Sequence, residues 1–144
     1  MRFDKTKSAG FLANHMARLF TNGLHQRIAP LGIAPAQFMA LLELWGEKDG
    51  LTQRELVERL DVEQATMANT LARMQRDGLI EKKPHPSDKR AQIICLTQKA
   101  IDLKPDAIAA AAAQNKLALS DLSEEEHRHF LDMMGRVVNS MKAG

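Results

Sequence analysis

The sequence predicts a mainly α-helical protein that carries one small β-hairpin. Apolar residues recur every three or four positions along most of the 144-residue chain, as they do in helices that bury one side. Residues 79–96 differ, because they combine β-branched residues with two closely spaced prolines, Pro84 and Pro86. A chain of this length is of common size for one domain. We therefore expect a single domain over residues 1–144.

The first long helix is expected from about Ala9 to Ala29, after a polar and basic arm at residues 1–8. Its apolar residues follow helical spacing and are Leu12, Met16, Leu19, Phe20, Leu24 and Ile28. Pro30 and Gly32 end it. A second helix begins at Pro35, which fits a first helical turn, and Gly46 ends it. Its apolar side is formed by Phe38, Leu41, Leu42 and Trp45.

Two short helices follow in close succession. Thr52 and Glu55 have the spacing of a capping box, in which each side chain bonds a backbone N–H at the helix start. The helix that they open ends near Leu60, and only Asp61 and Val62 separate it from the next helical pattern. A connection this short is typical of a helix-turn-helix.

The second helix of this pair has two different sides. Met67, Leu71 and Met74 form a narrow apolar side, and the opposite side carries Ala65, Asn69, Arg73 and Arg76. Short residues near the start and arginines further along suit a helix that approaches base edges first and phosphates later. An ordinary amphipathic surface helix gives the same pattern, so this stretch alone does not decide the function.

A hairpin is expected after Gly78, which stops the second helix. Residues 79–83 are extended, and residues 84–90 form a loop because two prolines remove backbone donors there. Residues 91–96 form the returning strand, which leaves Lys89 and Arg90 at the tip. A basic hairpin behind a helix-turn-helix is a wing.

On these residues the chain resembles the MarR family of bacterial winged-helix transcription regulators, over almost its whole length. The most specific match is Asp88-Lys89-Arg90 followed by Ile94-Cys95-Leu96-Thr97, and Ile33 to Phe38 also resembles the start of the family's second helix. The resemblance implies that Arg90 enters a minor groove and that Asp88 helps to hold it. The alternative interpretation of the tip is a solvated charged turn.

The terminal helices are expected to form a dimer. Thr97 caps a helix that continues through an alanine run to about Leu117, with either a bend or a break near Pro105; the resemblance favours a continuous, bent helix. Another capping box, Ser123 and Glu126, opens a last helix with a broad apolar stripe. We expect residues 1–30 and 98–144 to pair across a two-fold axis, with residues 33–97 as the DNA-binding lobe. Folding back onto their own subunit is the alternative.

Composition sets limits on the function. The net charge is only +2, so the placement of cations on the second helix and wing, not their number, favours DNA. The single cysteine excludes an internal disulfide, and neither a signal peptide nor a long apolar run is visible, which predicts a cytoplasmic protein. No cofactor or catalytic motif is present, so we expect no enzymatic activity.

The predicted DNA-binding residues lie on the second helix and the wing. Asn69 can bridge an adenine, while Ala65 or the Thr66 methyl can touch a thymine methyl. The arginines are expected at phosphates; for Arg76, a solvated charge is an equally good interpretation, and Thr66 has the alternative of bonding its own helix backbone. The full set is Gln64, Ala65, Thr66, Asn69, Thr70, Arg73, Arg76, Asp88, Lys89 and Arg90.

A ligand-responsive repressor is the function that we expect. Two recognition helices can enter successive major grooves if they stand about 34 Å apart, so the operator should be near-palindromic. A small ligand where the first, second and alanine-rich helices meet the lobe would favour one separation by binding the two states unequally. The resemblance implies anionic aromatic or phenolic effectors. The candidate ligand-binding residues are His15, Met16, Leu19, His25 and Trp45.

Other interpretations remain open. The chain could be a winged-helix module that binds another protein, or a thiol-based redox sensor acting through Cys95. The family's oxidant sensors use a cysteine near the first helix, where this chain has none, so an inert, small apolar role for Cys95 is favoured. A metal site among Glu124, Glu125, Glu126, His127 and His129 is disfavoured, because histidines two positions apart point to different sides of a helix. The effector, the operator and the regulated genes cannot be read from the sequence.

Overall fold

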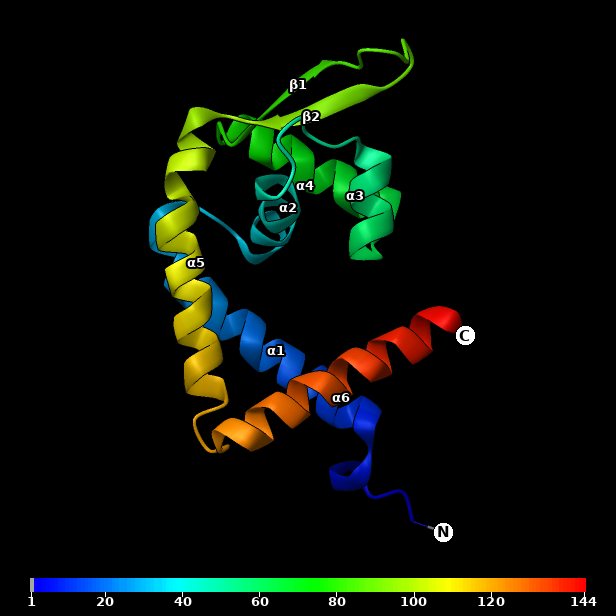
Figure 1. Cartoon of the computed structure of the whole chain (residues 1–144), viewed down its shortest axis with the longest axis vertical. Coiled ribbons are helices and arrows are strands. Elements are labelled where there is room, and N and C mark those ends of the chain that lie inside the picture. The colour runs from blue at the N-terminus through cyan, green and yellow to red at the C-terminus, as the bar shows by residue number, and fades with distance from the viewer. Residues whose placement is uncertain (1) are drawn as a thin grey trace.

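Six α-helices and one antiparallel hairpin make up the computed structural model, which describes residues 2–144 (Figure 1). The α-helices are α1 (Ala9–Ile28), α2 (Pro35–Trp45), α3 (Gln53–Leu60), α4 (Gln64–Arg76), α5 (Gln98–Ala118) and α6 (Glu124–Ala143). The strands are β1 (Ile80–Pro84) and β2 (Gln92–Leu96), and two 3-10 turns lie at Lys5–Lys7 and Ala29–Leu31. The mainly α fold with one hairpin is as predicted. Part of the predicted arm is therefore a 3-10 turn, and Met1 lies outside the described residues.

Both predicted capping boxes are formed. At the start of α3 the Thr52 N–H donates to Glu55 Oε1 over 3.0 Å, and the Glu55 N–H donates to Thr52 Oγ1 over 3.1 Å. Ser123 and Glu126 exchange the same pair of bonds at the start of α6. The backbone N–H of Thr52 lowers the pKa of Glu55, because it stabilises the ionised carboxylate. These bonds fix where α3 and α6 begin.

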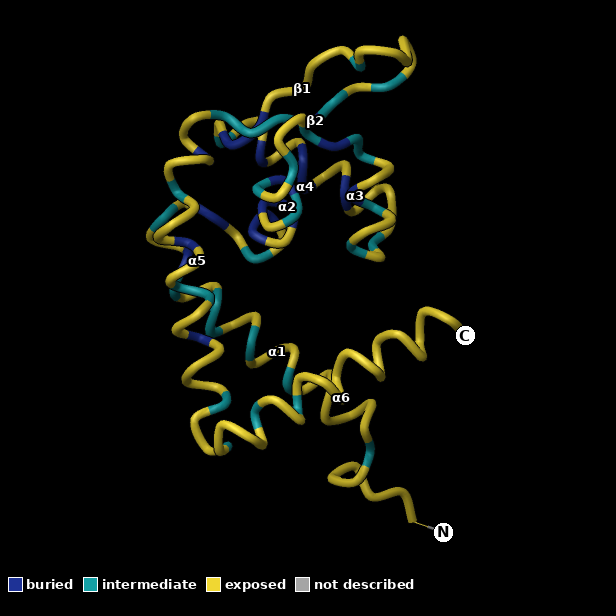
Figure 2. Tube along the Cα trace, in the orientation of Figure 1, coloured by how far each residue is buried: buried dark blue, intermediate teal, exposed yellow. Residues whose placement is uncertain are grey.

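The helices α2, α3 and α4 enclose one apolar core together with the hairpin. The core residues contributed by these elements are Phe38, Ala40, Leu41, Leu44, Leu56, Met67, Leu71, Met74, Ile80 and Ile94, all buried. Figure 2 shows the buried segments concentrated in this lobe. Burial of the apolar sides of three short helices is what makes them stable, since helices of this length are marginal alone.

The hairpin is joined to the segment before α3. β1 and β2 pair from Ile80↔Leu96 to Pro84↔Gln92. The Leu51 N–H donates to Ile94 O over 3.1 Å, and the Ile94 N–H donates to Leu51 O over 2.7 Å. Gly50 precedes this bridge with φ +81°, and a Cβ there would overlap the Ile94 carbonyl oxygen. Glycine at position 50 therefore allows the loop to reach the wing.

The long helices α1 and α5 pack against each other below the lobe (Figure 1). α5 is one continuous helix through Pro105, as the resemblance favours, and a break at Leu103-Lys104 is not found within the described chain. Ala107 is buried and Ala110 and Ala111 are half-buried, which lets α1 come close. Ala113 is exposed.

The last helix, α6, runs from the end of α5 toward α3 and leaves most of its surface exposed (Figures 1 and 2). His127 and Phe130 are half-buried, and all its other residues are exposed. The apolar stripe predicted for this helix faces solvent, with Val137 at 56% and Met141 at 76% exposed. Near its end Lys142 Nζ lies 3.3 Å from Asp61 Oδ2 at the end of α3. The stripe is therefore not covered by its own subunit.

No single helix among residues 2–144 is long and apolar enough to cross a membrane. The segments Ala9–Leu31 and Pro35–Trp45 reach that length and apolarity only when they are taken together, and a bend of 76° separates them.

Candidate nucleic-acid interface

The turn between α3 and α4 consists of Asp61, Val62 and Glu63, one residue more than predicted. Asp61 ends α3 in the left-handed conformation with φ 53° and ψ 44°. Aspartate is one of the few residues apart from glycine that visits this region, so the chain can change direction here. Val62 packs against the lobe core. The turn thus positions the start of α4 relative to α3.

The two sides of α4 are as the helical spacing predicts. Met67, Leu71 and Met74 are at most 3% exposed and pack into the core. On the other side Ala65, Asn69, Arg73 and Arg76 are all exposed. Gln64 and Thr66 in the first turn are exposed as well. A row of short and amide side chains that ends in arginines is therefore open to a partner.

Thr70 does not belong to this exposed side, contrary to the prediction. Its side chain is buried, and its Oγ1 donates to the Thr66 carbonyl oxygen over 3.0 Å. Thr70 lies three residues after Met67 and four before Met74, which places it on the core side of the helix. It cannot reach a base edge without unfolding α4.

Gln53 is a residue that sequence reasoning missed. Its Nε2 donates to Gln64 Oε1 over 3.2 Å and to the Gln64 carbonyl oxygen over 3.4 Å. The contact ties the first turn of α3 to the first turn of α4 and orients Gln64. The two glutamines lie on different helices, so spacing along one helix does not connect them and the sequence carried no signal for the pair.

The two arginines of α4 have different surroundings. Arg76 Nε lies 3.0 Å from Asp77 Oδ1, and Asp77 also accepts a hydrogen bond of 2.9 Å from Gln37 Nε2. The Arg76 guanidinium lowers the pKa of Asp77, and Asp77 raises the pKa of Arg76. No ion pair is found for Arg73 within residues 2–144. Arg73 is thus available to a partner, whereas Arg76 pairs with Asp77 at the C-terminus of α4.

The wing tip is a hydrogen-bonded loop between β1 and β2. His85 Nδ1 accepts from the backbone N–H groups of Ser87 and Asp88, each over 3.0 Å. Asp88 Oδ1 in turn accepts from the Arg90 N–H over 2.9 Å and lies 3.9 Å from Arg90 Nε. The Arg90 side chain is 96% exposed. The Arg90 side chain therefore points outward, while Asp88 fixes the Arg90 backbone. His85 is a second residue whose role in the loop the sequence did not reveal.

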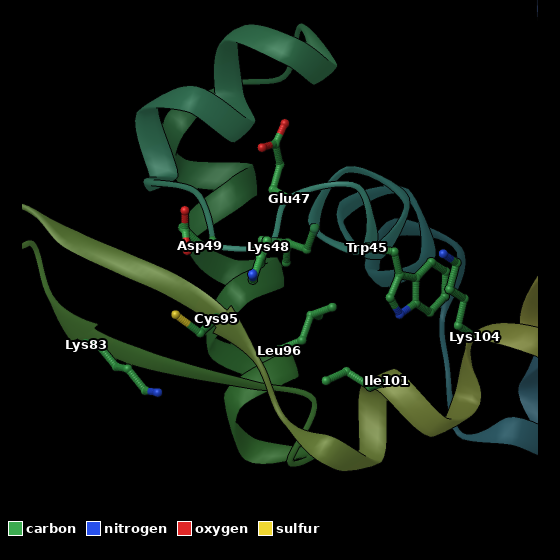
Figure 3. Close-up of a pocket in the computed structure, with 11 residues that line it drawn as sticks. Trp45, Glu47, Lys48, Asp49, Lys83, Cys95, Leu96, Ile101 and Lys104 are labelled. Atoms are coloured by element: carbon green, nitrogen blue, oxygen red, sulfur yellow. The ribbon is translucent and has the colours of Figure 1, made fainter.

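The five candidate ligand-binding residues do not form one site. Met16 and Leu19 line a hollow of about 450 Å³ between α1, α5 and α6. Trp45 lines a different one, of about 470 Å³, beneath the hairpin (Figure 3). His15 and His25 are exposed on α1, and the ring of His15 meets the ring of Phe11 edge-on. One subunit does not bring them together, because helical spacing, on which their choice relied, does not show which helices meet.

Trp45 has a structural role at its position. Its indole N–H donates to the Ala100 carbonyl oxygen over 3.1 Å, and its ring lies edge-on to Phe38 with 6.0 Å between centroids. These contacts fasten the start of α5 to α2. Cys95 lines the same hollow beneath the hairpin and is half-buried in β2 (Figure 3).

Two further hollows lie where α1, α2 and α5 meet the lobe, the junction at which a ligand was expected. One, of about 390 Å³, is lined by residues of α1, α2 and α5. The other, of about 340 Å³, lies between α1, α2, the α3–α4 turn and the inner side of α4. Within residues 2–144, no group of three or more His, Cys, Asp or Glu side chains is placed to hold a metal ion.

Comparison with known proteins agrees with this architecture. Residues 31–91 match the profile of the MarR family. An organic hydroperoxide resistance transcriptional regulator from Bacillus subtilis is 34% identical over 110 residues, which are 74% of each chain. The chain belongs to the MarR family of transcriptional regulators. The regulator HosA from Escherichia coli O111:H- is 30% identical over 70% of this MarR-family chain and 75% of its own length.

Solved structures of MarR-family proteins share the whole fold. A MarR regulator from Methanosarcina mazei Go1 superposes with a TM-score of 0.86 at 24% identity, over 94% of this chain and 97% of that one. The PcaV regulator from Streptomyces coelicolor, solved in complex with its natural ligand, gives 0.83 at 25% identity over 98% and 99% of the two chains. The predicted winged-helix fold is confirmed.

Proposed function

We propose that this MarR-family regulator is a homodimer that binds a near-palindromic DNA operator, represses from it, and is released by a small ligand. The observation that carries the proposal is the pairing of two cationic elements on one lobe. The exposed side of α4 carries Arg73, and the wing tip presents Arg90 held by Asp88. A helix for a major groove and a basic hairpin for the neighbouring minor groove or backbone are the parts that duplex recognition needs.

Base reading is assigned to the first two turns of α4. Gln64, Ala65, Thr66 and Asn69 are exposed there. The Asn69 amide can donate to and accept from one adenine edge, and the small side chain of Ala65 allows close approach. Phosphate contact is assigned to Arg73, and minor-groove or backbone contact to Lys89 and Arg90.

Dimerisation is assigned to residues 1–30 and 98–144, and DNA binding to the lobe at residues 33–97. The support is the exposed apolar surface on α1, α5 and α6, where Leu19, Leu117 and Val137 are each more than half exposed. An apolar surface that follows three long helices is typical of an interface between subunits. Two lobes held about 34 Å apart would meet successive major grooves of one duplex.

A ligand acts in this scheme by changing the separation of the lobes. The hollow between α1, α2 and α5 and the hollow between α1, α2 and α4 lie at the junction of the dimerisation helices and the lobe. A molecule bound there shifts the equilibrium only as far as it prefers one separation over the other. Release from DNA therefore requires tighter binding to the state whose recognition helices do not match the groove spacing.

The test is binding of the purified protein to the duplex that flanks its own gene. Fluorescence polarisation is measured against a scrambled duplex of equal length at several salt concentrations. We expect tighter binding to the flanking duplex and affinities that fall as salt rises, because phosphate contacts release counterions. Equal and salt-independent affinity for the two duplexes would contradict the proposal and favour a winged-helix module that binds another protein.

A further inference from the structure

The two hollows at the junction of α1, α2 and α5 are neighbours and form one trough. Thr21, Leu24 and Met39 line both of them. One end of the trough reaches Gln114 and Asn115 on α5, and the other reaches Thr66 and Thr70 on α4. A molecule in the trough would therefore touch both a dimerisation helix and the recognition helix.

The lining of the trough is uncharged. Its residues are apolar apart from threonines and the two amides Gln114 and Asn115. Among the residues that the structure describes, no lysine, arginine, histidine or acid lines either hollow. A carboxylate that entered would lose water without gaining a cation. Burial of an unpaired ion is far more costly than burial of a neutral polar group that finds a hydrogen bond. The trough thus selects against anions.

Gln114, which lines the trough and also the hollow between α1, α5 and α6, has an unused hydrogen-bonding group. Its side chain is nine-tenths buried, and its Oε1 has no partner among the described residues. The amide packs against α1 at Gly23, where any Cβ would overlap it. A buried amide oxygen without a partner is unfavourable, so a small rotation of the side chain toward a donor in the trough would be stabilising.

We propose that the effector of this regulator is an uncharged, mainly apolar small molecule with one hydrogen-bond donor, and that Gln114 accepts that hydrogen bond. The inference rests on the proposed function, because it names the ligand of the same regulatory junction. It departs from the anionic aromatic effectors that the family resemblance implied.

Cationic side chains gather at another hollow, beneath the hairpin. Lys48, Lys83 and Lys104 line that hollow (Figure 3), together with Asp49 and with Glu47, whose carboxylate lies 2.9 Å from Arg59 Nη1. An anion would be drawn there and not to the trough. An experiment must therefore separate the two places.

The sole tryptophan responds to a ligand in either place. Trp45 lies edge-on to Phe38, which lines the trough, and itself lines the hollow beneath the hairpin. A fluorescence change is therefore assigned to the trough only where Ala111→Phe removes it and Lys104→Ala does not. The probes are benzamide and benzoate, which share shape and size and differ in charge. At neutral pH we expect benzamide to bind the full-length protein at least about tenfold more tightly than benzoate, because the trough offers no cation to a carboxylate.

Variants assign the binding to Gln114. Replacement Gln114→Leu puts an apolar side chain of similar size in place of the amide. We expect it to weaken the binding of benzamide by roughly tenfold, while toluene, which makes no hydrogen bond, binds unchanged. Ala111→Phe fills the trough and should abolish binding of both. Lys104→Ala, in the hollow beneath the hairpin, should leave both unchanged and serves as the matched control.

Three outcomes would overturn the inference. They are binding of benzoate as tight as that of benzamide, equal loss of benzamide and toluene in Gln114→Leu, and no binding of any probe, as would follow if the second subunit fills the trough. Duplex binding is measured separately on the same samples. Probe binding without any effect on DNA affinity would contradict the ligand-released repressor of the proposed function and leave the ligand class standing.

Discussion

Asn69 is the residue on which sequence recognition by α4 depends most in our proposal. It is exposed on the second turn, two turns before Arg76. An amide that bridges an adenine discriminates by about 1–3 kcal/mol against other bases. We therefore expect Asn69→Ala to weaken binding of the flanking duplex by about that amount and to change binding of a scrambled duplex little, as measured by fluorescence polarisation.

Arg73→Ala is the matched control for Asn69→Ala. It lies four residues further along the same exposed side, and phosphate contact carries no sequence information. The variant should weaken both duplexes to the same extent and reduce the salt dependence of binding by about one counterion. If Asn69→Ala weakens both duplexes equally, as Arg73→Ala does, Asn69 does not read bases.

The loop before α3 depends on the backbone conformation of Gly50. With φ +81° and the Ile94 carbonyl oxygen at the place of a Cβ, we expect Gly50→Ala to lower the free energy of unfolding by about 1–3 kcal/mol. Urea denaturation measures the effect. Gly46→Ala is the control, because Gly46 has φ −85° and its Cβ would lie 3.6 Å from the nearest atom. Equal stability of the two variants would contradict the prediction.

Asp77 links the end of α4 to α2 and makes that link sensitive to acid. Arg76 and Gln37 bond its carboxylate, which lowers its pKa below the ordinary value of 3.8. The unfolded chain therefore binds the proton first, so the contribution to stability is full above pH 3.8 and is lost as the pH falls through the folded pKa. Urea midpoints of the parent and Asp77→Asn should differ at pH 6 and converge below pH 3.8; a constant difference would contradict this.

At the scale of single elements, much of the fold could be read from the sequence. Helical spacing, capping residues and prolines act over a few residues, so α1, α3, α4 and the hairpin were predicted within a residue or two. Thr70 was wrongly placed on the exposed side although its spacing from Met67 and Met74 puts it on the core side. Contacts between distant residues, such as Gln53 with Gln64, carry no local pattern and needed the structure.

The candidate ligand-binding residues are dispersed over different hollows for the same physical reason. Met16 and Trp45 each occupy a sensible place on their own helix, and the packing of α1 and α2 against other elements sends them to different hollows. Gln114, which the structure brings to the trough, looked from the sequence like one polar residue after an alanine run. A site assembled from three helices cannot be found from the periodicity of any one of them.

The conformation of the wing tip depends on hydrogen bonds from side chains. Substitution of these side chains can therefore disorder the loop while Lys89 and Arg90 remain in place. His85 fixes the backbone of Ser87 and Asp88, and Asp88 holds Arg90. We expect His85→Ala and Asp88→Ala each to weaken DNA binding by about 1 kcal/mol, and the double variant by much less than the sum, since both act through Arg90. Strict additivity in polarisation measurements would show that His85 and Asp88 act independently.

The whole molecule places its apolar surface in two different ways. In the lobe it is enclosed by α2, α3, α4 and the hairpin, whereas along α6 it is left open. Val137 and Val138 at the centre of the α6 stripe are each more than half exposed. The lobe core is enclosed within one chain, while in the proposed dimer a second copy would cover α6. Folding and assembly are consequently separable by mutation.

Val137→Glu is the change that tests the assembly. A carboxylate in the middle of the stripe would be buried without a partner in a dimer, so we expect the mass in solution to fall to that of one 16.0 kDa chain. Two lobes that bind together gain roughly 10² to 10⁴ in affinity over one, and this gain should disappear for the flanking duplex. The circular dichroism of the lobe helices should persist.

Asn139→Glu adds the same charge on the opposite, polar side of α6 and should leave mass and DNA affinity unchanged. The pair of variants separates assembly from nonspecific repulsion between a new carboxylate and DNA, because both place one negative charge at the same distance along the helix. If Val137→Glu stays dimeric, or if it becomes monomeric and still binds the flanking duplex as tightly as the parent, recognition does not depend on two lobes held at the pitch of the duplex.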